Sequence, residues 1–237
     1  MDNFRLWPAV VVASALTLVC SVAAGVAARS ASTELTRGPS AAEVKAAARL
    51  EVAERWRSWA AGRIFPASLA YSAEQGGQER AGRIGISPAT GCADSVDAEA
   101  AGALDAAGCR GVLRATYIDA LRGVLVTIGV VALPDERRAA RARSAFPGTG
   151  EPVPGLRPVA FRGTVAHRFA PAVRQSGSVR QAGPYLVLTT AGQVDGRPAS
   201  REQRPAVFAF AAEISERVLA GLTRPVTPDC TAAEWRC

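Results

Sequence analysis

The chain has 237 residues, 49% of them hydrophobic, and a formal net charge of +7 at pH 7. A chain of this length has room for one folded domain of about 150 to 200 residues beside a terminal segment, and two full domains would be crowded. We expect no nucleic-acid partner, because Lys45 is the only lysine and the arginine, alanine, glycine and proline content resembles the codon bias of a GC-rich genome. The densest basic run, 137–143, lacks interleaved aromatic residues and is predicted to be a solvated helix face.

An uncharged apolar segment, 7–28, lies between Arg5 and Arg29. As a helix it would span about 33 Å, close to the ~30 Å hydrocarbon core of a bilayer. Residues 1–29 are therefore predicted to be a single transmembrane anchor, in which Cys20 acts as a small apolar residue. A cleaved signal peptide is the alternative, but the apolar run exceeds the usual ~7 to 15 residues. The basic residues on the two sides are too evenly balanced to give the orientation.

Four cysteines follow the apolar segment: Cys92, Cys109, Cys230 and Cys237. An even number beside an export signal indicates disulfides and an oxidising compartment, so we expect the main domain to be extracytoplasmic. Of the three pairings we favour Cys92 with Cys109 and Cys230 with Cys237, because each pair closes a short loop. A zinc site is not expected, because the sequence has no close pair such as CxxC and His167 is its only histidine.

Residues 30–39 are polar and without pattern, and they are predicted to be a linker to one domain over 40–237. Ser40 and Glu43 form an S-A-A-E capping box, which predicts the start of a helix that ends near Gly62. The two tryptophans of its apolar stripe are expected in the core. The stripe consists of Val44, Ala48, Val52, Trp56 and Trp59.

The middle of the chain alternates short apolar segments with turns. Two apolar islands, 63–71 and 82–91, are candidates for edge strands, and an alanine-rich helix is predicted over 93–107. Two β-branched stretches, 112–118 and 123–133, are joined by a short turn and predict an antiparallel hairpin. The second strand is apolar on both faces, which is typical of a central strand.

In the last third, Pro134 is predicted to lie in the first turn of another helix. The proline-rich loop 147–158 is either a mobile lid or a tolerated insertion, of which the second is commoner. Strands are predicted over 178–182 and 185–192, and a final helix follows. The apolar side of that helix consists of Val207, Ala211, Ile214, Val218 and Leu222. Together these elements predict an α+β fold, with a mostly antiparallel sheet packed against helices.

No residue is predicted to be catalytic, cofactor-binding or metal-ligating. His167 would have to carry any imidazole chemistry, yet it has no serine, cysteine or carboxylate partner at a recognisable spacing. Ser87 lies in GISPA, which lacks the final glycine of a nucleophile elbow, and Lys45 has no SxxK motif around it. The GTG at 148–150 does not continue as a phosphate-binding loop.

Paired carboxylates are the remaining route to hydrolysis. Such chemistry needs two carboxyl groups roughly 5 to 9 Å apart in a cleft, a distance that the sequence does not give. Asp94 is better explained as an acid favoured in the first turn of a helix. The candidates are Asp94, Asp97 and Glu99 in one group and Asp135 and Glu136 in the other.

Four stretches resemble those of uncharacterised membrane-anchored proteins from Streptomyces and related actinomycetes: ERWRSWAAGRIFPASLAY, GRIGISPATGC, RATYID and GVVALPDERRAARA. The resemblance covers roughly 43–222 and implies a membrane anchor with an outer domain, but that group has no established activity to transfer. A looser similarity, in layout alone, links the chain to extracellular sensor domains of actinobacterial membrane proteins. It implies how the fold is used and nothing more specific.

These observations favour a non-enzymatic module of the bacterial cell envelope, held in the membrane by its N-terminal helix and binding an envelope protein or a cell-wall component. A cell-wall hydrolase that acts through carboxylates is the first alternative. The second is a sensor that binds a small ligand between sheet and helices. No cofactor is expected under any of the three.

Overall fold

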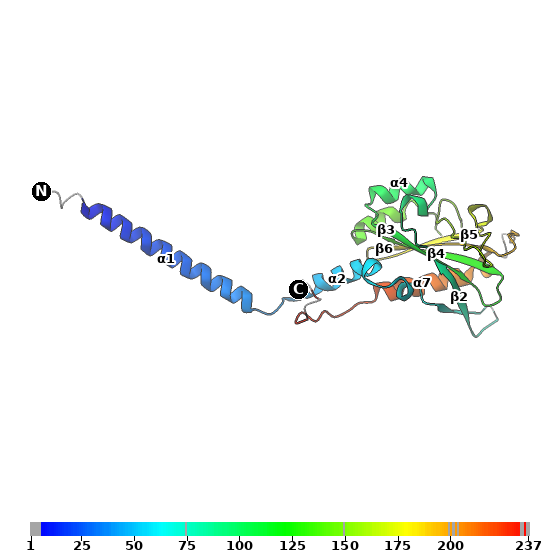
Figure 1. Cartoon of the computed structure of the whole chain (residues 1–237), viewed down its shortest axis with the longest axis horizontal. Helices are drawn as coiled ribbons and strands as arrows, with labels where there is room; N and C mark the ends of the chain where they lie inside the picture. Colours follow the sequence, from blue (N-terminus) through cyan, green and yellow to red (C-terminus); the bar gives the residue numbers. More distant parts are fainter. Residues whose placement is uncertain are drawn as a thin grey trace. The chain divides into compact units, whose positions relative to one another are not determined.

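A computed structural model describes residues 6–73, 75–148, 150–198, 200, 202, 204–232 and 235 (Figure 1). The chain divides into two units, one formed by Met1–Ala46 with Pro228–Cys237 and the other by Ala47–Thr227. The second unit holds the whole sheet and is narrower than the domain predicted over 40–237. It ends soon after the last helix because the described residues beyond that helix form only turns and irregular structure.

The N-terminal helix α1, Leu6–Thr36, contains one segment long and apolar enough to cross a membrane, Val11–Glu34, with a mean hydropathy of 2.2. None of that segment is buried against protein, and Leu16 and Leu18 are 67% and 68% exposed. The predicted apolar helix is confirmed, but it extends through most of the predicted linker. The reason is that no glycine or proline lies between Gly25 and Gly38, so nothing ends the helix before Gly38 and Pro39.

The second helix, α2 (Ala41–Ser58), begins at the predicted capping box. The Ser40 amide donates to Glu43 Oε2 at 2.7 Å, and the Glu43 amide donates back to Ser40 Oγ at 3.3 Å. The two bonds satisfy amides that have no partner inside the helix, which fixes where the helix begins. A short helix, α3 (Ala61–Ile64), follows.

Six strands form one sheet in the order β1-β2-β3-β4-β6-β5, and every neighbouring pair is antiparallel. The predicted antiparallel sheet and the β3–β4 hairpin are confirmed, and every residue of β4 is buried, as expected of a central strand. Of the two predicted edge strands, only β1 lies at an edge. The strands are β1 Ser68–Ser72, β2 Gln78–Ile86, β3 Gly111–Ile118, β4 Val124–Ala132, β5 Ser176–Ala182 and β6 Tyr185–Gln193.

Helices cover both faces of the sheet, and Figure 1 shows α7 and α4 on opposite sides of it. The larger core lies between the sheet, α7 (Ala209–Thr223) and residues of α2 that include Val52 and Trp56. The second core lies under α4 (Ala98–Ala106) and α5 (Glu136–Arg143). The sheet is therefore the middle layer of the fold, since strands apolar on both faces must be covered twice.

Three predicted helix boundaries are corrected. The helix expected over 93–107 is split into a 3-10 turn, Ala93–Ser95, and α4, because Asp97 between them turns its side chain to a distant partner. Asp135 caps α5 by accepting the Arg138 amide at 2.9 Å, so Pro134 precedes that helix. The last predicted helix is interrupted at Phe208, which separates α6, Arg204–Val207, from α7.

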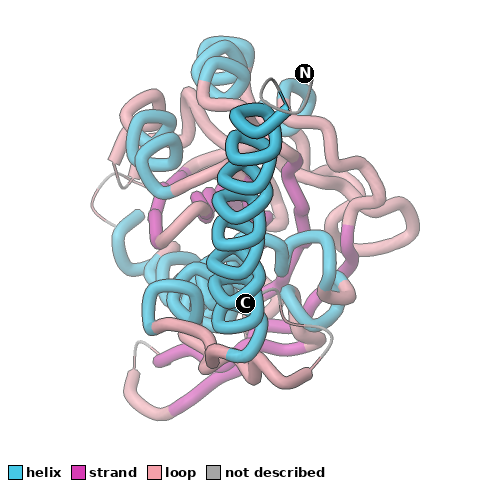
Figure 2. The backbone as a smooth tube through the Cα atoms, turned by 90° about the vertical axis from the view of Figure 1, so that its left-hand side faces the viewer, coloured by secondary structure: helices cyan, strands magenta, loops and turns pink. Residues whose placement is uncertain are grey.

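The long connection from α5 to β5, one of the loops drawn in pink in Figure 2, is anchored along the α4 face of the sheet. Leu156 is completely buried over Gly129, where an added Cβ would lie 2.5 Å from its Cδ1 atom. The Val159 amide donates to Thr127 Oγ1 at 3.1 Å, and its carbonyl accepts from Thr116 Oγ1 at 2.8 Å. The segment 147–158 thus contributes to the core and is not a surface lid.

Cys92 and Cys109 form the predicted disulfide, across a sequence separation of 17. It joins the approach to α4 with the approach to β3, and both cysteines are half-buried against the second core. Cys230 takes part in a disulfide as well, whereas Cys237, its predicted partner, lies outside the described residues. Cys20, in α1, is a free cysteine.

Replacing both Cys92 and Cys109 with alanine is expected to lower the free energy of unfolding by about 3 kcal/mol, because the unfolded chain regains the entropy of the open loop. Urea unfolding followed by circular dichroism measures the change. The single replacement Cys20→Ala is the control and should leave the midpoint unchanged. An equal midpoint for the double variant and the parent chain would contradict the prediction.

Candidate functional site

The five predicted carboxylates are not brought together as a catalytic pair. Asp97 is only 13% exposed at its side chain and pairs with Arg174, with Oδ2 2.7 Å from Nη1 and Oδ1 3.1 Å from Nη2. Its Oδ2 also accepts the Gly155 amide at 2.8 Å. Asp135 is the cap of α5. The other three, Asp94, Glu99 and Glu136, have exposed side chains.

The remaining candidates from the sequence do not assemble into a site either. His167 is exposed, with Nδ1 2.9 Å from the Thr164 carbonyl, and Ser87 is buried in a local turn with Ala89. Lys45 is exposed on α2, and the GTG sequence includes Thr149, which lies outside the described residues. Among the residues that the structure describes, no group of three or more His, Cys, Asp or Glu side chains is placed to hold a metal ion.

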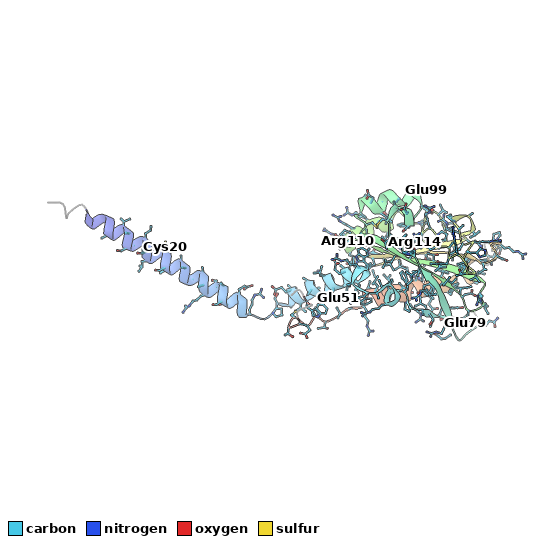
Figure 3. All side chains as sticks on the ribbon, in the orientation of Figure 1. Cys20, Glu51, Glu79, Glu99, Arg110 and Arg114 are labelled. Carbon is cyan, nitrogen blue, oxygen red and sulfur yellow. A yellow bond between two sulfur atoms is a disulfide. The ribbon has the colours of Figure 1, made fainter. Side chains whose placement is uncertain are left out.

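A groove of about 870 Å³ lies at one end of the sheet. The end of β1 and its turn to β2, the turn from β3 to β4, the end of β6 and the start of the α6–α7 segment all contribute to its walls. A volume of this size is within the ~300 to 1,000 Å³ range of small-molecule sites. Glu79, labelled in Figure 3, marks the β2 side of the groove.

The inner part of the groove is apolar. Tyr71 and Phe210 are 5% and 7% exposed, and their rings contact each other with centroids 5.0 Å apart and planes inclined by 44°. Val124 lies beside them and is 8% exposed. A tilted aromatic pair of this kind forms a rigid wall, because its rings have few rotatable bonds and are held by the core.

The Tyr71 hydroxyl ties three elements together. It donates to Glu79 Oε2 at 2.5 Å, across the β1–β2 pair, and accepts the Ala120 amide of the β3–β4 turn at 3.0 Å. Burial, reinforced by the neighbouring Glu79 carboxylate, raises the pKa of Tyr71 to about 12. The hydroxyl therefore stays protonated and holds the β3–β4 turn against β1 at neutral pH.

Asp119 organises the β3–β4 turn at the mouth of the groove. Its Oδ1 accepts the Val124 amide at 2.7 Å and its Oδ2 accepts the Leu121 amide at 3.2 Å, as is usual for aspartate at the start of a turn. Arg122 adopts a left-handed backbone with φ of 58°, which closes the turn. The consequence is that Leu121 stands at the tip, 82% exposed, where an apolar side chain has no packing partner in the fold.

Carboxylates outnumber cations along the groove. Glu79, Asp119 and Asp195 line it, and Arg122 is the one cationic residue among the described lining residues. Asp195 accepts the Arg197 amide at 2.9 Å and its Oδ2 lies 3.5 Å from Arg197 Nε, so Arg197 partly offsets its charge and the negative rim rests on Glu79 and Asp119. An apolar wall with a negative rim suits a molecule that carries an apolar body and a positive charge.

The chain was compared with protein-family models, curated proteins and solved structures, and nothing matched. The predicted resemblance to actinomycete membrane-anchored proteins therefore stays a prediction, and the groove must be interpreted from its own chemistry.

Sequence reasoning missed this groove. The sequence predicts a short turn between 112–118 and 123–133, but it does not indicate a role for Asp119, Tyr71 or Phe210 in a site. One local signal was present, since the short turn Asp-Ala-Leu-Arg-Gly, 119–123, contains a large apolar residue, Leu121. The other groove residues come together through the strand order, which brings the ends of β1 and β6 to the same end of the sheet as that turn.

Alkaline pH is expected to destabilise the fold between about pH 10 and pH 12. Unfolded tyrosines ionise near pH 10. Burial raises the pKa of all three tyrosines of the chain, to about 12 for Tyr71 and Tyr185 and also upward for Tyr117. The fold favours the protonated forms, so this stabilisation is complete below pH 10 and is lost as the pH rises toward 12.

Tyrosinate absorbance and circular dichroism, followed together during a pH titration, test this expectation. The two signals should change together above pH 10, because ionisation accompanies unfolding. Tyrosinate that appears near pH 10 while the circular dichroism of the fold persists would contradict the burial of the three hydroxyls.

Proposed function

We propose that the protein is a membrane-anchored, extracytoplasmic binding module of the cell envelope, whose groove holds a small ligand with an apolar body and a positively charged group. The single observation that carries this proposal is the groove itself, with its aromatic wall and acidic rim. The location rests on α1 and on the Cys92–Cys109 disulfide, since disulfides persist mainly in oxidising compartments.

The contacts inside the groove support binding of a positive charge. Among the described residues, Glu79 accepts one hydrogen bond, from the Tyr71 hydroxyl, and a carboxylate has about four lone-pair positions in all. It can therefore accept further donors from a ligand amine without losing its internal bond. The Tyr71–Phe210 wall and the exposed Leu121 side chain supply the apolar contact next to it.

Binding is favoured over carboxylate-dependent hydrolysis because the five acidic residues considered as catalytic candidates have structural roles or lie outside the groove. Asp97 is held in an ion pair and Asp135 in a helix cap, so both have structural roles. None of the five predicted acids lines the groove. The acids that do line it, Glu79, Asp119 and Asp195, lie in hydrogen bonds that set the local fold.

The ligand class is tested with n-hexylamine, hexan-1-ol and hexanoate, titrated into the full chain in detergent and followed by isothermal calorimetry. We expect saturable binding in the order amine, alcohol, acid. Glu79→Gln keeps an acceptor for the Tyr71 hydroxyl but removes the charge. The variant should therefore bind n-hexylamine no more tightly than hexan-1-ol. Glu99→Gln, on the exposed surface of α4, is the matched control. Equal binding of amine and acid would refute the proposal.

The location is tested in intact cells with Cys92→Ala, which leaves Cys109 without its partner. We expect a membrane-impermeant maleimide to label this variant and to leave the parent chain unlabelled at that position. Labelling that appears only after the cells are lysed would place the domain in the cytoplasm and contradict the proposal.

A further inference from the structure

Arg114 is a buried cation that forms no ion pair with any described carboxylate. It lies on β3, on the same face as Val112 and Thr116, and is only 8% exposed. Its Nη1 atom reaches the Arg157 carbonyl at 3.4 Å, and its Nε atom has no hydrogen-bond partner. Within the described part of the chain, no carboxylate oxygen comes within 4.0 Å of the guanidinium.

Arg55 and Arg174 also have enclosed side chains, and each is paired with a carboxylate. Arg55, 3% exposed, pairs with Glu51 and donates to the carbonyls of Leu222 and Arg224. Arg174 pairs with Asp97 and donates to several backbone carbonyls. The fold thus supplies partners where a buried guanidinium is structural, and burying such a charge without a partner is unfavourable.

A second cation lies next to Arg114. Arg157 has an exposed side chain, while its backbone is fixed because its amide donates to the Ser95 carbonyl at 2.8 Å and Leu156 before it is buried. Burial, together with the Arg157 charge, lowers the pKa of Arg114, and the exposed Asp94 carboxylate acts in the opposite direction. The burial of Arg114 and the charge of Arg157 therefore both disfavour the charged guanidinium when no anion is bound beside it.

We propose that Arg114 and Arg157 form a binding site for a small oxyanion, a carboxylate or phosphate group. A guanidinium donates charge-assisted hydrogen bonds to such a group. Among the described residues, neither Nη2 nor Nε of Arg114 has a protein acceptor; Nε is enclosed by protein, so the anion contacts the guanidinium at Nη2. Arg157 closes the site from the solvent side with a second positive charge. Arg114 fixes the orientation of the anion and Arg157 adds attraction.

This site is separate from the groove. Neither Arg114 nor Arg157 lines the groove, and Figure 3 shows Arg114 well away from Glu79. The two sites also select opposite charges, so the oxyanion site does not rest on the proposed function. Each proposal can fail while the other stands.

The test is a titration of the full chain in detergent with inorganic phosphate and, separately, with acetate, by calorimetry at an ionic strength held constant with chloride. We expect one saturable site. Arg114→Met should abolish it, Arg157→Ala should weaken it at least about tenfold, and Arg143→Ala on exposed α5 should leave it within about twofold. Arg114→Met replaces an unpaired buried charge with an apolar side chain, so it is expected to fold.

The two anions distinguish the ligand source: tighter phosphate binding indicates a phosphorylated ligand, and tighter acetate binding indicates a carboxylate. No saturable binding of either anion, or unchanged binding by Arg114→Met, would overturn the proposal.

Asp94 provides a further test, because among the described residues its carboxylate is the acid that acts on Arg114. If the site binds anions, Asp94→Asn removes a repelling charge, so phosphate binds more tightly and the phosphate-free protein is no less stable. If Asp94 instead neutralises Arg114 in solution, Asp94→Asn lowers the thermal midpoint of the phosphate-free protein, and the proposal fails.

Discussion

Replacing Asp97 with alanine is expected to lower the free energy of unfolding by about 3 to 5 kcal/mol, because the replacement leaves a buried cation without its partner. The Arg174 side chain is 6% exposed and keeps only backbone carbonyls once the carboxylate is gone. The Gly155 amide also loses its acceptor. The damage should spread to Leu156, which this network holds over Gly129.

Urea unfolding monitored by circular dichroism measures the effect of Asp97→Ala. Asp105→Ala, an exposed aspartate at the end of α4, is the control and should change stability by no more than about 0.5 kcal/mol. The double variant Asp97→Leu with Arg174→Met removes both charges and should recover part of the loss. A change in Asp97→Ala as small as in the control would mean that the ion pair does not hold the fold.

Replacing Arg55 with methionine is expected to cost about 2 to 4 kcal/mol of folding stability, since its guanidinium satisfies groups that no other side chain reaches. Its Nη1 atom donates to the Leu222 and Arg224 carbonyls at 2.8 and 2.7 Å, at the end of α7. It also pairs with Glu51 and lies 4.7 Å from the centre of the Trp59 ring. Arg55 therefore links α2 to carbonyls at the end of α7 that have no partner inside that helix.

Arg57→Met is the matched control, because Arg57 lies on the same helix but is 66% exposed at its side chain and pairs with Glu54 alone. Stability measured in urea should fall for Arg55→Met and hold for Arg57→Met. Amide exchange near the end of α7 should speed up in the Arg55 variant alone. Equal stability of the two variants would show that the α2–α7 link carries little free energy.

The candidate groove illustrates what sequence reasoning reaches and where it stops. The turn that presents Leu121 is predictable, because Asp119 at the start of a short connection between two β-branched stretches favours it. The Tyr71–Glu79 and Tyr71–Phe210 contacts are not predictable in the same way. They depend on β1 pairing with β2 and on α7 packing across β1, and neither follows from the local pattern around Tyr71.

The sequence does not reveal the partners of the buried charges either, for a related reason. Asp97 and Arg174 are 77 residues apart, and nothing near either residue indicates the other. Arg55 and Leu222, 167 residues apart, are a similar case. A charged residue in a predicted helix is expected to face solvent by default. Only the packed structure shows that Asp97 and Arg55 are enclosed by the domain.

The sequence by itself determined the features that depend on near neighbours: the apolar N-terminal helix, the capping box at Ser40, the β3–β4 hairpin, and the Cys92–Cys109 pair. Periodicity, caps and short loops act over a few residues, so each is visible in a window of the chain. Only the tertiary structure decided the strand order, the buried partners of Asp97 and Arg55, the groove, and the unpaired Arg114. These depend on which surfaces meet when both faces of the sheet are covered, and that choice is made by the packing of the whole domain.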